Sequence, residues 1–392
     1  MSATAHRPYV LDVSRLIWRL GGNRFPTGID RVCQAYLDAL ANESIALVQW
    51  RNLRLVMPAG TSDRLFRLLQ SGARRRFRLR LAAIVLPALI RNMFGNPDVG
   101  GKVLLNVGHT GLNAPGLVTW LAQSGMKPVY LIHDLIPITH PQYCRVGEAE
   151  RHARRMRQAL LSAHGIIANS AATGEELTRF AAAQGLPVPP MLVAHLGIEP
   201  LVPAPSVSAR NNPYFLCIGT IEGRKNHALL LRVWASLRER LGPLAPDLVL
   251  IGQRGWMAEE VFAALDTVPA ETGRIIELSS CNDTELASWI AHARAVLMPS
   301  HIEGYGLPVL EAMMLGAAVI ATDLAVYREI AGDIPLLLDA SDDEAWIEAI
   351  TSYTGHSSDR DRQVSALAGF APPIWPDHIR RVRDWLEATL AP

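Results

Sequence analysis

The chain has 392 residues, 49% of them hydrophobic, which is enough apolar sequence for a large core and suggests two or three domains. Its formal net charge of +1 gives no overall attraction to nucleic acid. The cysteines lie far apart without C-x-x-C spacing, which argues against a zinc site or a disulfide framework and favours a reducing cytoplasm: Cys33, Cys144, Cys217 and Cys281. Near the N-terminus, Asp12 and Arg15 interrupt any apolar stretch, so we expect no signal peptide.

The N-terminal part predicts a strand, a loop and a helix in succession. Residues 9–13 are an apolar run typical of a buried strand. The glycine-rich stretch 21–31 predicts a loop that opens a helix ending near Ala41. Residues 45–57 favour two short strands or a hairpin.

Residues 64–91 join a run of arginines to a run of apolar residues. Residues 51–91 contain ten arginines against one acid, Asp63, and the sequence R-R-R-F-R-L-R at 74–80 precedes the apolar run 81–90. Such a segment is typical of a helix lying on a membrane surface, and the alternative is a solvated helix followed by a buried one. The run is too short to span a bilayer. Because no interleaved aromatics or base-reading motif accompany the arginines, we expect no nucleic-acid partner.

The remainder of the first half alternates strands and helices. Residues 102–107 and 128–133 predict buried strands, and the second ends at His133, at the edge where open α/β sheets bind ligands. Helices are expected at 148–164 and from 171 onward, and strands at 165–170 and 191–195. Prolines, serines and asparagines in 200–212 predict a linker.

The second half restarts this pattern. Residues 214–220 predict a strand, followed by a turn containing Arg224 and Lys225 and a helix to about Leu241. Two adjacent cations on a turn at a strand end suit a diphosphate. Further strands are expected at 247–252, 274–278, 317–323 and 334–338, and an amphipathic helix at 379–390.

The stretch 301–313 carries the most informative pattern. It follows an apolar run, 295–300, that predicts a buried parallel strand, and Pro308 stands where a helix can begin without an N–H donor. Glu303 is expected in the loop, and Glu311 on the first turn of the helix. Glycines at 304 and 306 allow close approach to backbone N–H groups, and a helix N-terminus favours an anion. Carboxylates beside an anion site favour neutral hydroxyl partners, so the pattern indicates a nucleotide sugar.

The sequence E-G-Y-G-L-P-V-L-E-A-M at 303–313 resembles the signature of retaining glycosyltransferases of family 4. The resemblance implies an α/β protein of the GT-B fold, with two Rossmann-like domains facing across a cleft and a C-terminal helix crossing back to the first. It implies domains at 1–200 and 201–375, and the returning helix at 376–392. Glu303 would contact the donor sugar and Glu311 the ribose. The backbone of the intervening loop would hold sugar and phosphate: Gly304, Tyr305, Gly306 and Leu307.

Other motifs extend this resemblance. Lys225 matches the basic residue that binds the donor phosphates; many members also have an arginine where Thr220 stands here, so Arg224 becomes the second cation. The run H-D-L-I-P from His133 is similar to the bacterial mannosyltransferase branch, whose matching histidine lies beside the donor sugar. In the family, the loop that matches residues 21–31 faces the cleft and contacts donor phosphate or acceptor, and Gly28 and Arg31 are the candidate site residues in it.

The resemblance implies a retaining, metal-independent enzyme without a cofactor beyond its nucleotide-sugar co-substrate. Catalytic roles fall to His133, Lys225 and Glu303. GDP-mannose is the expected donor, and a lipid-linked oligosaccharide of surface polysaccharide synthesis (exopolysaccharide, capsule or O-antigen) is the expected acceptor. Together with the basic segment 64–91, this predicts a cytoplasmic protein peripherally associated with the inner membrane.

Other classes fit less well. A nicotinamide dehydrogenase needs a third glycine after Gly304 and Gly306, and a P-loop needs Ser or Thr after Lys102. The D-x-D at 359–361 lies in a polar stretch after the second group of strands, which argues against a metal-dependent transferase. A family 4 enzyme using a UDP-sugar or another nucleotide sugar is an alternative, and a non-catalytic interaction protein with the same fold is an alternative of another class.

Overall fold

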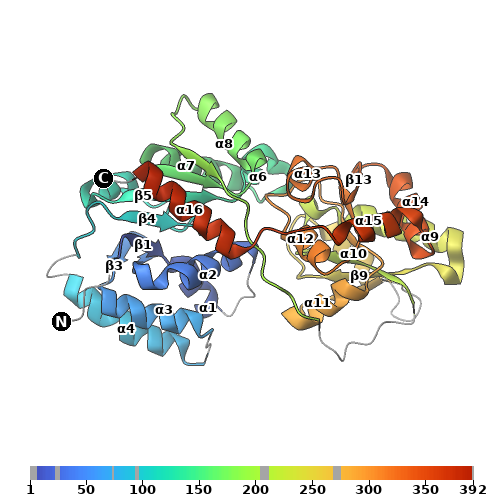
Figure 1. The fold of residues 1–392 in the computed structure, drawn as a ribbon, viewed down its shortest axis with the longest axis horizontal. Helices are drawn as coiled ribbons and strands as arrows, with labels where there is room; N and C mark the ends of the chain where they lie inside the picture. Colours follow the sequence, from blue (N-terminus) through green and yellow to red (C-terminus); the bar gives the residue numbers. More distant parts are fainter. Residues whose placement is uncertain are drawn as a thin grey trace. The chain divides into compact units, whose positions relative to one another are not determined.

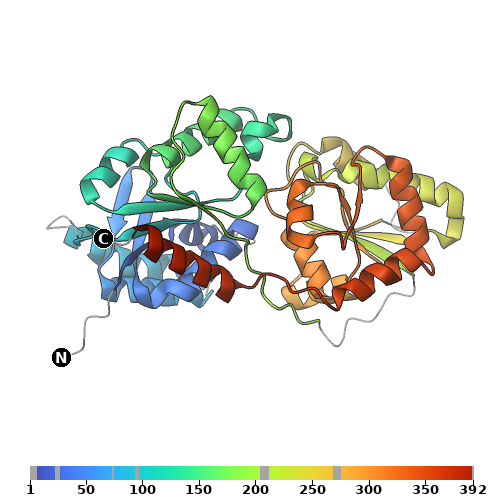
Figure 2. The same ribbon diagram turned by 45° about the horizontal axis from the view of Figure 1, so that its top comes forward.

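The computed structural model describes residues 7–22, 27–72, 75–92, 97–203, 212–267 and 275–390. Arg74 of the basic segment lies outside these residues. The chain forms two compact units (Figures 1 and 2): unit 1 contains residues 1–135, 150–197 and 374–392, and unit 2 contains residues 136–149 and 198–373.

Unit 1 is built on a seven-stranded sheet in the order β3-β2-β1-β4-β5-β6-β7, counted over its described residues. All neighbouring strands are parallel except β2 and β3, which are antiparallel. Of the two possibilities for residues 45–57, two short strands or a hairpin, the structure therefore shows the hairpin. The bounds are β1 (Tyr9–Asp12), β2 (Ser44–Trp50), β3 (Leu53–Val56), β4 (Val103–Asn106), β5 (Lys127–Ile132), β6 (Gly165–Ala168) and β7 (Met191–Val193).

Helices connect these strands. They are α1 (Ser14–Gly21), α2 (Gly28–Leu40), α3 (Ala59–Gln70), α4 (Phe77–Asn92), α5 (Leu117–Ser124), α7 (Glu148–Ser162), α8 (Ala171–Ala183) and the C-terminal α16 (Trp375–Leu390). The predicted return of the C-terminal helix to the first domain is confirmed. Its His378 is buried between the hydroxyl of Tyr36, at 2.8 Å, and the carbonyl of His195, at 2.8 Å.

Unit 2 contains a fully parallel sheet of six described strands in the order β10-β9-β8-β11-β12-β13. The strands are β8 (Tyr214–Ile218), β9 (Asp247–Ile251), β10 (Ile275–Leu278), β11 (Val296–Met298), β12 (Val319–Thr322) and β13 (Leu336–Leu338). The helices are α9 (His227–Leu241), α10 (Glu259–Thr267), α11 (Asp283–His292), α12 (Leu307–Met314), α13 (Ala325–Ala331), α14 (Asp343–Thr354) and α15 (Ser358–Leu367). The fully buried Trp234 and Trp346 anchor α9 and α14 in one core with β8 and β9.

Besides shifts of the boundaries to 197/198 and 373/374, the units differ in one respect from the domains predicted at 1–200, 201–375 and 376–392. Residues 136–149, which hold α6 (Ile136–Thr139) and a 3₁₀ turn (Pro141–Tyr143), group with unit 2 although they lie between β5 and α7 of unit 1. The physical reason is that their aromatic and cationic side chains stack on rings of unit 2, as Tyr143 does on His301. Hydrophobic periodicity carries no signal for such contacts, because it reports only local structure.

Candidate functional site

The strand order of unit 2 defines where a ligand can bind. From β8 the chain proceeds to β9 and β10 on one side of the sheet, then crosses to β11 on the other side of β8. In open α/β sheets, ligands bind outside the carboxyl ends of the strands at this switch point. Two loops meet there: residues 219–226 after β8, and residues 299–306 after β11.

The loop after β8 is tied to the loop after β9. The N–H of Ile221 donates to the carbonyl of Gln253 at 2.9 Å, and the N–H of Gly223 donates to the carbonyl of Trp256 at 3.2 Å. A Cβ at Gly223 would lie 2.6 Å from the carbonyl oxygen of Met257, so only glycine permits this approach. These contacts fix the turn that presents Arg224 and Lys225.

The loop after β11 ends in the helix start that the sequence predicts. Helix α12 begins at Leu307 with a proline in its first turn, and Gly306 precedes it with φ +111°. A Cβ at Gly306 would lie 2.6 Å from the ring of Tyr327, which adds a packing reason for glycine. The expectation that Glu311 projects from the first turn is wrong. Because the helix begins at Leu307, Glu311 lies one turn later and is only 5% exposed.

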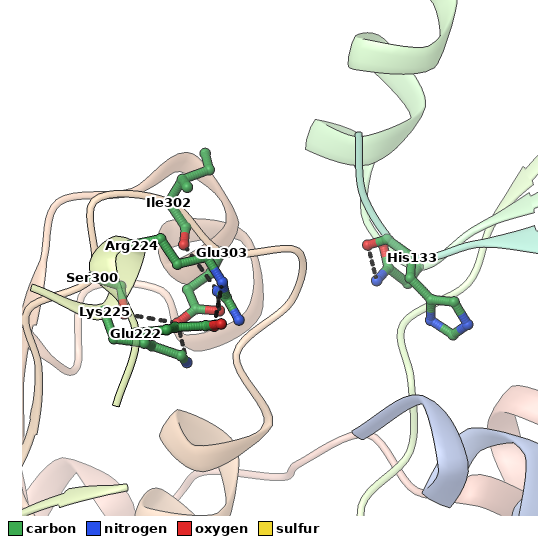
Figure 3. Close-up of polar contacts among 8 residues, drawn as sticks. His133, Glu222, Arg224, Lys225, Ser300, Ile302 and Glu303 are labelled. Carbon is green, nitrogen blue, oxygen red and sulfur yellow. Dashed lines mark hydrogen bonds and ion pairs between the residues drawn. The ribbon is translucent and has the colours of Figure 1, made fainter. Parts of the chain in front are cut away.

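Glu303 is the centre of a buried polar cluster (Figure 3). Its carboxylate accepts hydrogen bonds from Lys225 Nζ, from Arg224 Nη1 at 2.7 Å and from Ser300 Oγ at 2.7 Å. Arg224 also donates from Nη1 to the carbonyl of Ile302 at 3.2 Å, and its Nε pairs with Glu222 at 2.7 Å. The structure therefore brings together three of the predicted site residues and makes them one another's partners.

Burial and charge set the protonation of this cluster. Burial alone would raise the pKa of Glu303, but Lys225 and Arg224 outweigh it and lower that pKa to about 2. Glu303 is thus ionised at any physiological pH. Burial also raises the pKa of Glu222, and there the opposing effect of Arg224 and Lys225 is weaker.

Sequence reasoning did not select Glu222 or Ser300. Both are among the buried polar residues of unit 2, and Glu222 Oε2 has no hydrogen-bond partner among the described residues. A usable signal was present, because a guanidinium held in a buried turn needs carboxylate partners and Glu222 lies two residues before Arg224.

His133 lies in unit 1, directly after β5, as predicted. It is 5% exposed, and its Nε2 lies 2.7 Å from the carbonyl oxygen of Val107. Its own carbonyl accepts from Asn169 Nδ2 at 2.8 Å (Figure 3). Burial lowers the pKa of His133 to about 4, so the ring is neutral at pH 7. Because Nε2 faces a carbonyl it carries the proton, which leaves Nδ1 as a hydrogen-bond acceptor.

Gly28 and Arg31 also belong to unit 1. Gly28 is the first residue of α2, and the N–H of the preceding Thr27 donates to Asp30 at 2.7 Å. Asp30 is buried and pairs with Arg15 at 2.6 Å and with Arg19 at 2.8 Å. Arg31 is half-buried. Residues 23–26 of the predicted loop lie outside the described residues.

Metal-ligating side chains do not gather in the described ranges: no set of three or more His, Cys, Asp or Glu there has the geometry to hold an ion. At the switch point of unit 2, the side chains of Arg224 and Lys225 and the backbone at the start of α12 are groups that can hold an anion.

Comparison with known proteins matches residues 212–355 to the family model of glycosyl transferases group 1. The chain is 27% identical over 236 residues to the serotype-specific mannosyltransferase WbdA of Escherichia coli, covering 55% of this chain and 29% of that protein. It is 29% identical over 254 residues to the O-antigen chain mannosyltransferase B of Escherichia coli, covering 62% of this chain and 65% of that protein. The matched region thus spans less than two thirds of either relative.

The fold of the whole chain has solved counterparts. HepE of Anabaena, solved in complex with UDP and glucose, superposes with a TM-score of 0.65 at 15% identity and covers 97% of this chain and 99% of its own. The predicted fold class is confirmed: the chain has two Rossmann-like domains in the GT-B fold, and residues 212–355 of the second match the model of glycosyl transferases group 1.

Proposed function

We propose that the protein is a retaining glycosyltransferase that moves mannose from GDP-mannose to a lipid-linked oligosaccharide during synthesis of a surface polysaccharide. The observation that carries this proposal is the cluster of Arg224, Lys225 and Glu303 at the switch point of unit 2, inside the matched domain. The names of the two Escherichia coli relatives support mannose as the sugar and O-antigen as the class of product.

The charges of the cluster suit a donor with a diphosphate and a sugar. Glu303 neutralises the cations, so a diphosphate competes with it for Arg224 and Lys225. As these contacts pass to the phosphates, the Glu303 carboxylate becomes available to accept hydrogen bonds from sugar hydroxyls. The N-terminus of α12 adds partial positive charge at the same edge of the sheet.

The leaving diphosphate is then stabilised by these groups, and it takes the proton of the acceptor hydroxyl on the face from which it departs. Glu311 is assigned to the ribose. From unit 1, the neutral His133 offers Nδ1 to a sugar hydroxyl. Because two side-chain cations and a helix terminus supply positive charge to the leaving group, we propose that the reaction requires no metal.

The test is a panel of nucleotide sugars. Purified full-length protein is incubated with GDP-mannose, UDP-glucose and other donors, and release of nucleoside diphosphate is measured with and without a lipid-linked acceptor and with and without EDTA. We expect acceptor-dependent release from GDP-mannose that EDTA leaves unchanged. Preference for a UDP-sugar would contradict GDP-mannose as the donor, and strict manganese dependence would contradict the metal-free reaction. Absence of turnover with every donor would favour the non-catalytic interaction protein.

We further propose that α4 docks this protein on an anionic membrane. The sequence left open whether the apolar run 81–90 is buried, and much of it is not. Leu79 is 69% exposed, Leu86 59% and Ile90 55%, at spacings that place them on one face of the helix. The inner face packs through Phe77 and Ala88, which are buried. In Figure 1, α4 lies beside α3 at the border of unit 1.

The charges around this face favour anionic lipid. The described arginines beside it are all exposed: Arg75, Arg76, Arg78, Arg80 and Arg91. Asp63, the one acid of residues 51–91, pairs with Arg7 at 2.9 Å. Each arginine near an anionic surface contributes about 1 kcal/mol before screening. Among the described helices, none combines the length and the hydropathy needed to cross a bilayer.

Co-sedimentation with vesicles tests this docking. We expect the protein to pellet with anionic but not with neutral vesicles, and less at high salt, because screening weakens the arginine contribution. Leu79→Ser with Leu86→Ser removes the apolar contact, and Arg75→Gln with Arg80→Gln removes charge. Arg232→Gln, an exposed arginine of unit 2, is the matched control. Equal pelleting of all these proteins would contradict the proposal.

A further inference from the structure

Residues 136–149 group with unit 2, and two of their side chains stack on rings beside the cluster of Arg224, Lys225 and Glu303. The segment begins three residues after His133 and continues into α7 of unit 1. Within it, Ile136 is buried, and every residue from 137 to 149 is half-buried or exposed, with Val146 fully exposed. The segment therefore adds little to the core of unit 2, and the contacts of individual side chains must account for its placement.

Tyr143 makes the first of these contacts. Its ring lies 5.1 Å from the ring of His301 with the planes 6° apart, and the ring of His140 lies 6.4 Å from Tyr143 at 15°. Stacked rings at such distances stabilise the contact beyond the area they bury. His301 immediately precedes the Ile302–Glu303 pair, and its N–H donates to the carbonyl of Arg224 at 2.8 Å. The stack thus bears directly on the backbone that joins the two loops of the cluster.

Arg145 makes the second contact. Its guanidinium carbon lies 5.1 Å from the ring centroid of Trp256. The carbonyl of Trp256 accepts the hydrogen bond from Gly223, at the start of that turn. A cation over an indole ring is an attractive contact even where water reaches it. Tyr143 and Arg145 therefore each touch a residue that is bonded to the turn carrying Arg224 and Lys225.

We infer that residues 136–149 are a strap that holds the donor-binding loops in place, with Tyr143 and Arg145 as positioning residues for the nucleotide-sugar diphosphate. The inference rests on the proposed function of the cluster for the identity of the ligand. Neither side chain needs to contact the donor. Side-chain stacking from a separate segment adds to the backbone hydrogen bonds of these loops and limits how far the loops can open.

Hydrogen exchange of the full-length protein tests the strap without any ligand. In Tyr143→Ala, we expect faster amide exchange over residues 222–225 and 300–304, because the bond from His301 to Arg224 opens more often. Tyr143→Phe keeps the ring and is the matched control, so its exchange stays at the wild-type rate. Unchanged exchange in Tyr143→Ala, or equal acceleration in both variants, would overturn the stacking role.

Binding of GDP and UDP, measured by calorimetry, links the strap to the donor. A lost aromatic pair predicts affinity about three- to tenfold weaker in Tyr143→Ala and unchanged in Tyr143→Phe. In a His301→Ala background, Tyr143→Ala should have no further effect, because the contact is already gone. Additive losses would show that Tyr143 does not act through His301. Failure of the wild type to bind either nucleotide would contradict the proposed function. The hydrogen-exchange rates would still show whether Tyr143 holds the two loops in place.

Discussion

Arg224 donates to the carboxylate of Glu303 at 2.7 Å, so the residue expected to bind a sugar is the counter-ion of a residue expected to bind phosphate. The side chain of Glu303 is 7% exposed and that of Arg224 is 23% exposed, so water screens the pair little. The Glu303 carboxylate thus keeps Arg224 and Lys225 paired before a diphosphate binds, and an incoming anion has to displace this carboxylate.

This competition predicts an unusual outcome for Glu303→Gln. Removing the carboxylate charge leaves Arg224 and Lys225 without their shared counter-ion, so free GDP or UDP should bind about three- to tenfold more tightly, while transfer slows because the sugar loses its acceptor. Calorimetry gives the affinity and diphosphate release gives the rate. Glu344→Gln, which breaks the exposed pair with Arg240 in the same unit, is the matched control. Weaker nucleotide binding by Glu303→Gln would contradict this view of the cluster.

Lys225→Ala should lower the rate of transfer by at least about a hundredfold, since a preorganised contact to a leaving group in a closed site is worth roughly 2.7–4 kcal/mol. Lys225 is 8% exposed, and its ammonium is bound to Glu303. Steady-state release of nucleoside diphosphate measures the effect. The control is Arg240→Ala, which removes an exposed, paired cation of the same unit. Near-normal turnover of Lys225→Ala would contradict a role for Lys225 in stabilising the leaving diphosphate.

Glu311 is buried, so a test of its role in ribose binding needs a variant that leaves folding intact. We expect Glu311→Gln to keep the shape of the side chain and the thermal midpoint within a few degrees, but to weaken donor binding by about tenfold, because a charged acceptor of hydroxyl protons is lost. Calorimetry with GDP and with guanine base alone distinguishes the ribose contact. Equal affinity of wild type and variant for GDP would contradict the assignment of Glu311.

Acid should destabilise the protein below about pH 6.5. Burial lowers the pKa values of His133, His227 and His378 to about 4, so between pH 6.5 and 4 the unfolded chain binds protons at these sites and the folded chain does not. Asp12 opposes this trend. Burial raises its pKa to about 6, so below pH 6 the folded state holds a proton that the unfolded state lacks.

The four groups together give the unfolded state an excess of roughly two protons near pH 5, which corresponds to a fall in the free energy of unfolding of about 2 to 3 kcal/mol per pH unit. Burial also lowers the pKa of His109, which acts in the same direction. Urea unfolding between pH 7 and 4.5 measures this slope. His378→Gln should reduce this slope by about 1 kcal/mol per pH unit, with the exposed His356→Gln as the control. A slope that does not change in His378→Gln would show that this imidazole is not held neutral by the fold.

The sequence by itself determined the strands and the helix start at the site. Buried parallel strands appear as continuous apolar runs, and the predicted strands 214–220, 247–252 and 317–323 match β8, β9 and β12 within two residues. Gly306 and Pro308 likewise fix the entry into α12 through backbone sterics that act locally. Helix α1 was not predicted, because its N-cap is Val13, which offers no side-chain hydrogen bond to mark the start.

Only the tertiary structure decided which side chains become partners. Lys225 and Glu303 meet because β11 returns to the side of β8 after two intervening strands. Tyr143 meets His301 because residues 136–149 group with unit 2. The exposure of Leu79, Leu86 and Ile90 depends in the same way on which face of α4 finds a neighbour. Periodicity reports the structure of a single segment, whereas these contacts depend on strand order and on packing between segments, for which local sequence carries no signal.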